Sequence, residues 1–225
     1  NKVLLTTEEQ TEGETYLLTV INIEDLNKNI MEDTTVEFTG YQQGEYDLIA
    51  DIQADPESYE GQEVTICGVV TIGVNIIQTG KTNAYVQDNS DRGINIFDYN
   101  VIEELVRGNL VEVTGEVEEY VDSYGNATTE IKNPVVTILD TGYTEPEPLK
   151  INLNQASDVS LEGTLLQVTG EIYEVYSAGG GTNLNIEDEQ GSQITVRVWD
   201  TTDLDLSEYV VGYILQATGV GDVYS

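Results

Sequence analysis

The chain has 225 residues, of which 42 are acidic, 8 are basic and none is histidine, giving a formal net charge of −34. Phosphate backbones and anionic membranes are bound mainly through Lys and Arg, so this charge predicts no nucleic-acid partner and no membrane insertion. Cys67 is the single cysteine, which excludes an intrachain disulfide, and the length suits two domains of about 100 residues each.

The N-terminal part of the chain is predicted to precede the main domains. Residues 1–14 are expected to form a strand followed by a polar tether, and the apolar residues of that strand are Val3, Leu4 and Leu5. Runs rich in Thr, Val and Leu at 15–23 and 34–39 predict two further strands. Residues 15–46 are therefore a β extension, and the sequence does not say where it packs.

Residues 47–144 are predicted to form the first domain. Alternating β-branched runs separated by Gly, Asn and Asp predict strands at 62–73, 82–88, 93–98, 109–121 and 127–139. Between the third and fourth strands, Asn100–Gly108 combines a capping Asn, an apolar pattern and a closing Gly. These three signals predict a short helix.

A linker at 145–149, stiffened by Pro146 and Pro148, leads to a second domain over 150–225. The same patterns predict its strands at 163–176, 182–187, 193–199 and 212–224. Leu204–Val211 is the predicted helical connection between the last two of these strands.

The second domain repeats the first. Ile94–Asp98 matches Val196–Asp200 at an offset of 102 residues, and the Val-Thr-Gly ending at Gly115 matches the Ala-Thr-Gly ending at Gly219 at an offset of 104. The strand at 127–139 has no counterpart after the second copy of this motif. Asn1–Glu8 instead resembles Asn133–Asp140, the end of the first domain's final strand.

Five strands with a helix between the third and fourth is the order of an OB-fold, a small Greek-key barrel. The predicted fold class is therefore all-β, with two tandem OB-fold-like Greek-key barrels and an N-terminal β extension. The second barrel lacks its final strand in the sequence.

The first domain resembles the OB-fold modules of secreted bacterial proteins. The residues that carry the resemblance are Ile49–Gln53, Tyr59–Val64, Gly68–Thr71, Tyr85–Asp88 and Gly93–Phe97. Such modules accompany extracellular nucleases, lamin-tail domains and other surface modules. The resemblance implies a secreted setting, and it implies little about activity because OB-folds host many functions.

The aromatic residues are predicted to serve the core. An OB-fold that binds a single strand combines stacking aromatics with a basic groove. Here Arg92, Arg107 and Arg197 are isolated among carboxylates, so Phe97 and Trp199 are expected to point inward.

Acidic turns are the candidate cation sites. Hard cations such as calcium need six to eight oxygen ligands, and tight acidic turns supply part of such a shell. The candidate ligands are Asp88, Asp91, Glu187 and Asp188. Ordinary solvated turns are the competing interpretation, and no other cofactor is indicated.

The sequence indicates no catalytic site. With no histidine and no nucleophile-elbow serine, the common hydrolytic constellations lack their residues. The chain is therefore predicted not to be an enzyme.

A barrel without its last strand exposes unpaired backbone groups, which invite a strand from elsewhere. The residues predicted to meet in such an assembly are Val3, Leu4, Leu5, Tyr213, Leu215 and Val223. Three arrangements are open: strand exchange between copies, a fold-back within one chain, and a segment of a longer OB array. Head-to-tail exchange does not close on itself and generates a filament.

The predicted function is a non-enzymatic structural subunit, extracellular or at the cell surface, that polymerises with itself by N-terminal strand complementation of the second barrel. The alternative is an accessory OB-fold module of a secreted nuclease or other cell-surface protein. A ligand-binding module, for calcium or a glycan, is the third hypothesis.

Overall fold

The computed structural model describes residues 15–21, 34–39, 46–156 and 158–222. The chain divides into two compact units, Asn1–Glu45 and Tyr46–Ser225. In the first unit, β1 (Thr15–Val20) and β2 (Thr34–Thr39) are the two strands expected from the sequence, and they pair antiparallel. The predicted borders at 14, 46, 144 and 149 stay predictions. No helix within the described ranges is long and apolar enough to cross a membrane.

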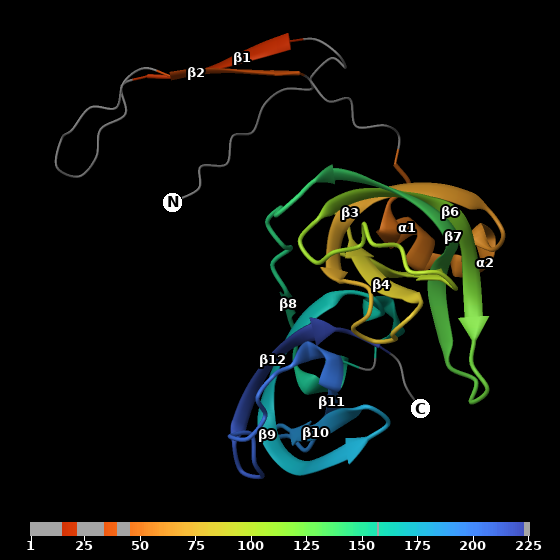
Figure 1. The fold of residues 1–225 in the computed structure, drawn as a ribbon. Coiled ribbons are helices and arrows are strands. Elements are labelled where there is room, and N and C mark those ends of the chain that lie inside the picture. Colours follow the sequence, from red (N-terminus) through yellow and green to blue (C-terminus); the bar gives the residue numbers. More distant parts are fainter. Residues whose placement is uncertain (1–14, 22–33, 40–45, 157, 223–225) are drawn as a thin grey trace. The chain divides into compact units, whose positions relative to one another are not determined.

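The second unit begins with a closed five-stranded barrel (Figure 1). Its strands are β3 (Glu63–Ile72), β4 (Thr82–Gln87), β5 (Gly93–Asp98), β6 (Leu110–Val121) and β7 (Ala127–Asp140). They close in the order β3-β4-β5-β7-β6, in which β5 and β7 are the parallel pair. This order confirms the predicted OB-fold, and all five strands lie within two residues of their predicted bounds.

Alternation along the strands builds the core of this barrel. One face of each strand carries β-branched residues, and Ile66, Ile94, Ile96, Val113 and Ile131 are completely buried together. Two short helices, α1 (Ile49–Ala54) and α2 (Pro56–Tyr59), lead into the barrel. α1 contributes Ile49 and Ile52 to the core.

The predicted helix at Asn100–Gly108 is wrong, because this segment is a series of turns. The Thr82 hydroxyl donates to the carbonyl oxygen of Asn100 at 2.7 Å and accepts from the backbone N–H of Ile102 at 2.9 Å. These bonds tie the start of the segment to β4. Leu105, which is completely buried, still reaches the core from a turn.

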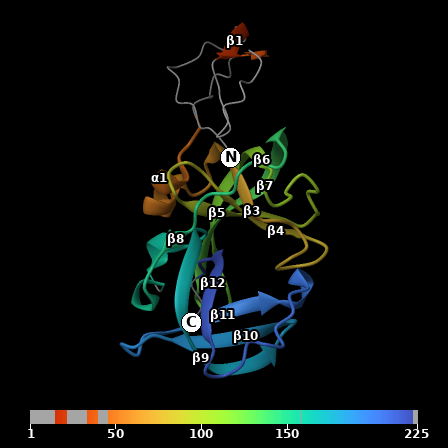
Figure 2. The ribbon, with the colours of Figure 1, turned by 90° about the vertical axis from the view of Figure 1, so that its left-hand side faces the viewer.

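The second barrel repeats this plan and is open. Its strands are β8 (Leu149–Lys150), β9 (Leu165–Ala178), β10 (Gly181–Glu187), β11 (Gln193–Trp199) and β12 (Ile214–Val220). Four of these strands are hydrogen-bonded in the order β11-β10-β9-β12, and β8 pairs with β9 in parallel. Figure 2 shows β9, β10 and β11 of this sheet below the first barrel's strands. Within the described residues no strand joins β11 to β12, which agrees with the predicted missing strand.

The second predicted helix, at Leu204–Val211, is also wrong. A single 3-10 turn, η3 (Asp200–Thr202), follows β11, and it ends at Asp203 in a left-handed conformation with a φ of 52°. The remaining residues form turns, such as the bond from the Tyr209 N–H to the Leu206 carbonyl at 3.0 Å. Two other 3-10 turns, η1 (Leu153–Gln155) and η2 (Val159–Leu161), precede β9.

The two barrels meet along a polar seam. The buried Gln87 side chain accepts a hydrogen bond from the backbone N–H of Leu165 at 2.7 Å. The carboxyl group of Glu162 accepts from the Thr129 N–H at 3.2 Å, and the Gln53 side chain donates to the carbonyl oxygen of Glu162 at 3.4 Å. The seam is therefore held by backbone groups of one barrel and side chains of the other.

Two glycines allow the barrels to approach this closely. A Cβ on Gly163 would lie 2.5 Å from the carbonyl oxygen of Gly93, and a Cβ on Gly93 would overlap the carbonyl of Gly163. Gly163 also has a φ of 72°, which side chains disfavour. Backbone thus packs directly on backbone, with no side chain between them.

We expect Gly93→Ala to loosen the seam. The added methyl overlaps a backbone carbonyl that cannot move without shifting a barrel, and overpacking of this kind costs about 1–3 kcal/mol. Urea unfolding is expected to show that loss, and limited proteolysis to cut the 145–149 linker faster. Asn89→Ala, at an exposed position in the neighbouring turn, is the control. Equal stability of the two variants would contradict the packing described here.

Candidate functional site

The outer face of β10 and β11 carries the polar and aromatic side chains that the core does not use. Leu184 and Ile186 of β10 and Val196 and Val198 of β11 belong to the core, so the alternate residues face outward. The outward residues, with one from β9, are Tyr176, Asn183, Asn185, Thr195, Arg197 and Trp199. We refer to these six residues as the β10–β11 face. In OB-folds the corresponding second and third strands carry the ligand-binding surface.

Cross-strand hydrogen bonds order this face. Asn185 lies between Glu174 and Thr195, donating to the carboxylate at 2.8 Å and accepting from the hydroxyl at 2.8 Å. In the next row, Arg197 donates to the Asn183 side chain at 2.8 Å. Tyr176 is the partner of Asn183 on the opposite strand and is 43% exposed.

Arg197 and Trp199 form the aromatic and cationic part of the face. The guanidinium carbon lies 4.5 Å from the centre of the Trp199 ring, within the range of a cation–π contact. The same guanidinium donates to the carbonyl oxygen of Gly179 at 2.9 Å and to that of Ala178. These bonds hold the guanidinium in place over the ring. The face thus carries two aromatic rings and an ordered guanidinium.

The prediction that Trp199 and Phe97 point inward is wrong. Both residues are partly exposed, and neither belongs to a core cluster. Val198 and Ile96, the residues immediately before them, take the inward positions. Arg197 and Trp199 are two residues apart on one strand, and side chains at this spacing share a face of the sheet. The spacing in the sequence could therefore have predicted that the two side chains lie together.

The corresponding face of the first barrel is largely covered. Tyr85, Gln87 and Asn95 are at most 5% exposed, although they alternate with the core residues of β4 and β5. Glu162 and Leu165 of the second barrel account for part of this cover, because Gln87 bonds to Leu165. Burial and the nearby carboxylates of Asp222 and Glu162 raise the pKa of Tyr85.

Only the far end of the first barrel's face is open. Tyr99 is 73% exposed, and its ring makes an edge contact with Phe97 at a centroid distance of 5.3 Å. The Lys81 ammonium lies 4.8 Å from the centre of the Tyr99 ring. Each barrel therefore pairs one cation with one outward aromatic, and only the second barrel presents the pair on an open sheet face.

Two buried carboxyl groups lie near the seam. Burial, together with the charges of Asp222 and Glu119, raises the pKa of Glu162 to about 8. Burial and the neighbouring Glu118 raise the pKa of Glu130 to about 7. A carboxyl group in such surroundings holds its proton near neutrality.

The candidate calcium ligands are not brought together. Asp88 accepts from the Ile49 N–H at 2.9 Å and so caps α1, and Asp188 accepts from the Ser192 N–H at 2.8 Å within its own turn. Glu187 accepts from Gln193 at 3.0 Å, and Asp91 is exposed with a φ of 60°. The described part of the chain contains no group of three or more His, Cys, Asp or Glu that could hold a metal ion. Calcium at these turns stays a prediction.

The predicted assembly residues are only partly described. Leu215 is buried in the second core, and the exposed Tyr213 makes an edge contact with Tyr209 at 5.3 Å. Val3, Leu4, Leu5 and Val223 lie outside the described residues.

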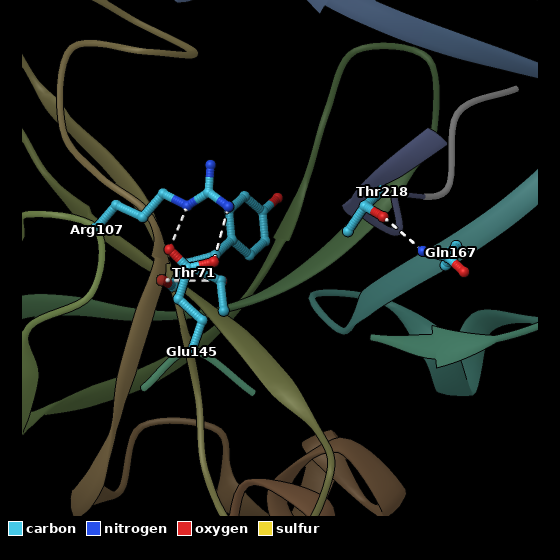
Figure 3. A network of polar contacts seen from close by, with 6 residues as sticks. Thr71, Arg107, Glu145, Gln167 and Thr218 are labelled. Carbon is cyan, nitrogen blue, oxygen red and sulfur yellow. Dashed lines mark hydrogen bonds and ion pairs between the residues drawn. The ribbon is translucent and has the colours of Figure 1, made fainter. Parts of the chain in front are cut away.

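Arg107 ties the linker to the first barrel. Its guanidinium donates two parallel hydrogen bonds of 2.8 Å to the carboxylate of Glu145 (Figure 3). Figure 3 also shows Gln167 of β9 donating to Thr218 of β12 at 3.1 Å. Arg107 therefore serves the linker, and Arg197 remains the arginine of the open sheet face.

The sequence is similar to part of Endonuclease YhcR of Bacillus subtilis (strain 168). The two share 30% identity over 167 residues, which are 71% of this chain and 13% of the endonuclease. The chain thus spans a small part of that protein's length. No protein-family model matches the chain.

Solved structures with similar folds include DNA-bound domains. A murine DNA-binding protein bound to double-stranded DNA has a TM-score of 0.34 and 12% identity, covering 61% of this chain and 75% of its own. The HINa domain of Ifi202 with a 20-base-pair duplex has a TM-score of 0.35 and 14% identity, covering 59% and 73%. At these TM-scores no binding site is transferred from the complexes to this chain.

The prediction of no nucleic-acid partner is nevertheless wrong, because the similar structures include complexes with double-stranded DNA. The physical error lies in the use of net charge. A charge of −34 is a sum over the whole surface, whereas a ligand meets one face. The β10–β11 face carries the ordered guanidinium of Arg197 beside Trp199, so the net charge of the whole chain does not describe this face.

We expect the stability of the second unit to fall as pH rises from about 4.5 to about 8. In the folded chain the pKa of Glu162 is about 8 and that of Glu130 about 7, against an ordinary value of 4.5. The folded state therefore holds protons that the unfolded state releases in this window, and the stabilisation is lost as pH rises through the folded values. Glu162→Gln is expected to flatten the profile and to be the more stable form at pH 8, since the amide oxygen still accepts from Thr129.

Urea unfolding at a series of pH values measures this effect. Glu57→Gln, at an exposed position on α2, removes the same charge elsewhere and is expected to keep the slope of the parent chain. An unchanged slope in Glu162→Gln would show that this carboxyl group is ionised in the folded state.

Proposed function

We propose that this chain is an accessory, non-catalytic OB-fold module of a nuclease-type protein, and that its β10–β11 face contacts a nucleic-acid strand. The observation that carries the proposal is the 30% identity to part of an endonuclease. The chain corresponds to 13% of that protein, so a module that works beside other parts is the natural role. The OB barrels supply a fold suited to binding.

The residue chemistry supports a non-catalytic role. The chain has no histidine, and the described residues contain no carboxylate or thiol cluster that could hold a metal ion. The carboxyl groups with the largest pKa shifts, Glu130 and Glu162, are buried near the seam. At the seam they are closed off from a large substrate.

The geometry of the β10–β11 face supports contact with a strand. Bases stack on aromatic rings regardless of sequence, and each stacked base contributes about 1–3 kcal/mol. Tyr176 and Trp199 supply rings, and Asn183 and Arg197 lie in register between β10 and β11. Because the net charge repels a phosphate backbone, we propose that stacking contributes more than phosphate contacts.

The setting that we propose is extracellular or the cell surface. A net charge of −34 is least costly where dissolved cations screen it. The predicted filament ranks second as a function, because the similarity to an endonuclease favours a module that acts beside a catalytic partner.

Binding of a labelled single-stranded oligonucleotide tests the proposal. Trp199 is the only tryptophan, so its fluorescence reports on the β10–β11 face alone and is expected to be quenched on binding. Trp199→Leu is expected to weaken binding about 5- to 150-fold, the equivalent of one lost stack of about 1–3 kcal/mol. Fluorescence anisotropy of the labelled strand measures this loss.

Tyr143→Leu provides a matched control, since it removes an aromatic ring that is 47% exposed on another part of the surface. Affinity that drops equally in both variants, or in neither, would rule out the β10–β11 face. Plasmid DNA incubated with the chain and Mg²⁺ is expected to stay intact. Cleavage that follows the chain through purification would contradict the non-catalytic role.

A further inference from the structure

Each barrel carries one cation over an aromatic ring at the same end of its sheet. In the first barrel, Lys81 directly precedes β4 and Tyr99 directly follows β5, and these two strand ends pair with each other. In the second barrel, Arg197 and Trp199 form the end of β11, which pairs with the start of β10. We refer to Lys81 with Tyr99 as the first pair and to Arg197 with Trp199 as the second pair.

A bond between the barrels brings these two ends together. Thr201 of η3, the turn that follows β11, donates from its hydroxyl to the carbonyl oxygen of Ile76. Ile76 belongs to the loop that ends at Lys81. Within this loop, the Gly80 N–H donates to the side chain of Asn75 at 3.1 Å. Since each residue spans at most about 3.6 Å, this path of bonds places the backbones of the two pairs within about 30 Å of each other.

The cations of both pairs lack carboxylate partners. In the described part of the chain, ion pairs with carboxylates are made by Arg107, with Glu145, and by Lys132, with Glu116 and Glu118. The ammonium of the first pair lies over a ring instead, and the guanidinium of the second pair lies over a ring and donates to neutral amide groups. In a chain with 42 acidic residues, the positive charge of these two cations is therefore not neutralised at contact.

We propose that one single strand of nucleic acid contacts both pairs, passing from the β10–β11 face across η3 to Lys81 and Tyr99 of the first barrel. This inference rests on the proposed function, and it adds a second contact region on the other barrel and a preference for unpaired bases. Each pair supplies a ring on which a base stacks and a cation for a neighbouring phosphate. Tyr99 is the accessible ring of the first pair, at 73% exposure.

Stacking on a protein ring favours a single strand over a duplex. A base offers its face to such a ring only when it is not stacked between neighbours in a duplex. A separation of about 30 Å corresponds to about nine nucleotides at the 3.4 Å spacing of a stacked strand. This length lies within the range of about 4–16 nucleotides that an OB-fold covers. A strand of about twelve nucleotides therefore reaches both pairs.

The seam between the barrels keeps the two pairs at a fixed separation. Gly93 and Gly163 are in direct backbone contact, and the buried Gln87 side chain bonds to Leu165. A strand that has bound one pair therefore meets the other without a rearrangement of the barrels. The second contact is then intramolecular, which raises the overall affinity above that of either region alone.

Carboxylates beside the rings set the orientation of the strand. Asp98 precedes Tyr99 in the chain, and the exposed Asp200 follows Trp199. A phosphate is repelled at these two positions. We therefore expect the bases to lie toward the rings and the phosphates to lie toward the two cations.

Binding of a twelve-nucleotide single-stranded DNA to the full chain tests the inference. Tyr99→Leu is expected to weaken this binding about 5- to 150-fold, through the loss of one stacked base. Fluorescence anisotropy of the labelled strand measures the loss. Tyr124→Leu removes a ring that is 76% exposed in the β6–β7 hairpin, and this control is expected to bind as the parent chain does. Equal affinity of the two variants would overturn the inference.

The dependence of the affinity on salt tests the cation of the first pair. Each phosphate contact with a single strand adds about 0.7 to the magnitude of the slope of log affinity against log salt concentration. Lys81→Gln is therefore expected to lower this magnitude by about 0.7. Lys150→Gln removes the same charge from β8 and is expected to leave the slope unchanged. Equal slopes in these two variants would contradict the contact at Lys81 and with it the path across the barrels.

A duplex and the Trp199→Leu variant separate this inference from the proposed function. A twelve-base-pair duplex of the same sequence is expected to bind at least about tenfold more weakly, since its bases are not free to stack on the rings. Loss of binding in Trp199→Leu with full binding in Tyr99→Leu would leave the proposed function standing and overturn the path across the barrels. Binding that neither variant weakens would overturn both. A duplex that binds as tightly as the single strand would overturn the preference for unpaired bases.

Discussion

Direct backbone contact between Gly93 and Gly163 is the constraint on which the arrangement of the second unit depends. Because no side chain lies between these two turns, the barrels are close enough for Gln87 to bond to Leu165 and for Glu162 to bond to Thr129. This approach buries most of the first barrel's β4–β5 surface. Two barrels of the same fold therefore have different surfaces available, and the second barrel keeps the open one.

The difference between the barrels also shows that the net charge of the whole chain does not describe each of its faces. Acidic residues outnumber basic ones by 42 to 8, yet the guanidinium of Arg197 is fixed over Trp199 on the open sheet face. Charge repulsion acts over the whole surface and is weakened by salt, whereas stacking acts at contact. At this face, the contacts available at short range are an aromatic ring and an ordered cation, whatever the net negative charge of the whole surface.

Strand order and bounds could be predicted from the sequence because alternation and the internal repeat are local signals. The helix at Asn100–Gly108 could not be excluded in the same way, since the Thr82 side chain that ties down its first residues comes from a distant strand. The seam between the barrels could not be predicted either. In the sequence, Gly93 and Gly163 resemble ordinary turn glycines, and only the structure shows that their backbones are in contact. The outward position of Trp199 was within reach, since its neighbour Val198 takes the inward place in the alternation.

The linker between the barrels has a mechanical consequence. Arg107 holds Glu145 at one end, and at the other end Leu149 and Lys150 enter the second sheet as β8, parallel to β9. A pulling force carried through the linker would act along β8 and load its bonds to β9 in shear, so that they resist together. Such a connection transmits tension from one barrel to the next with little slack.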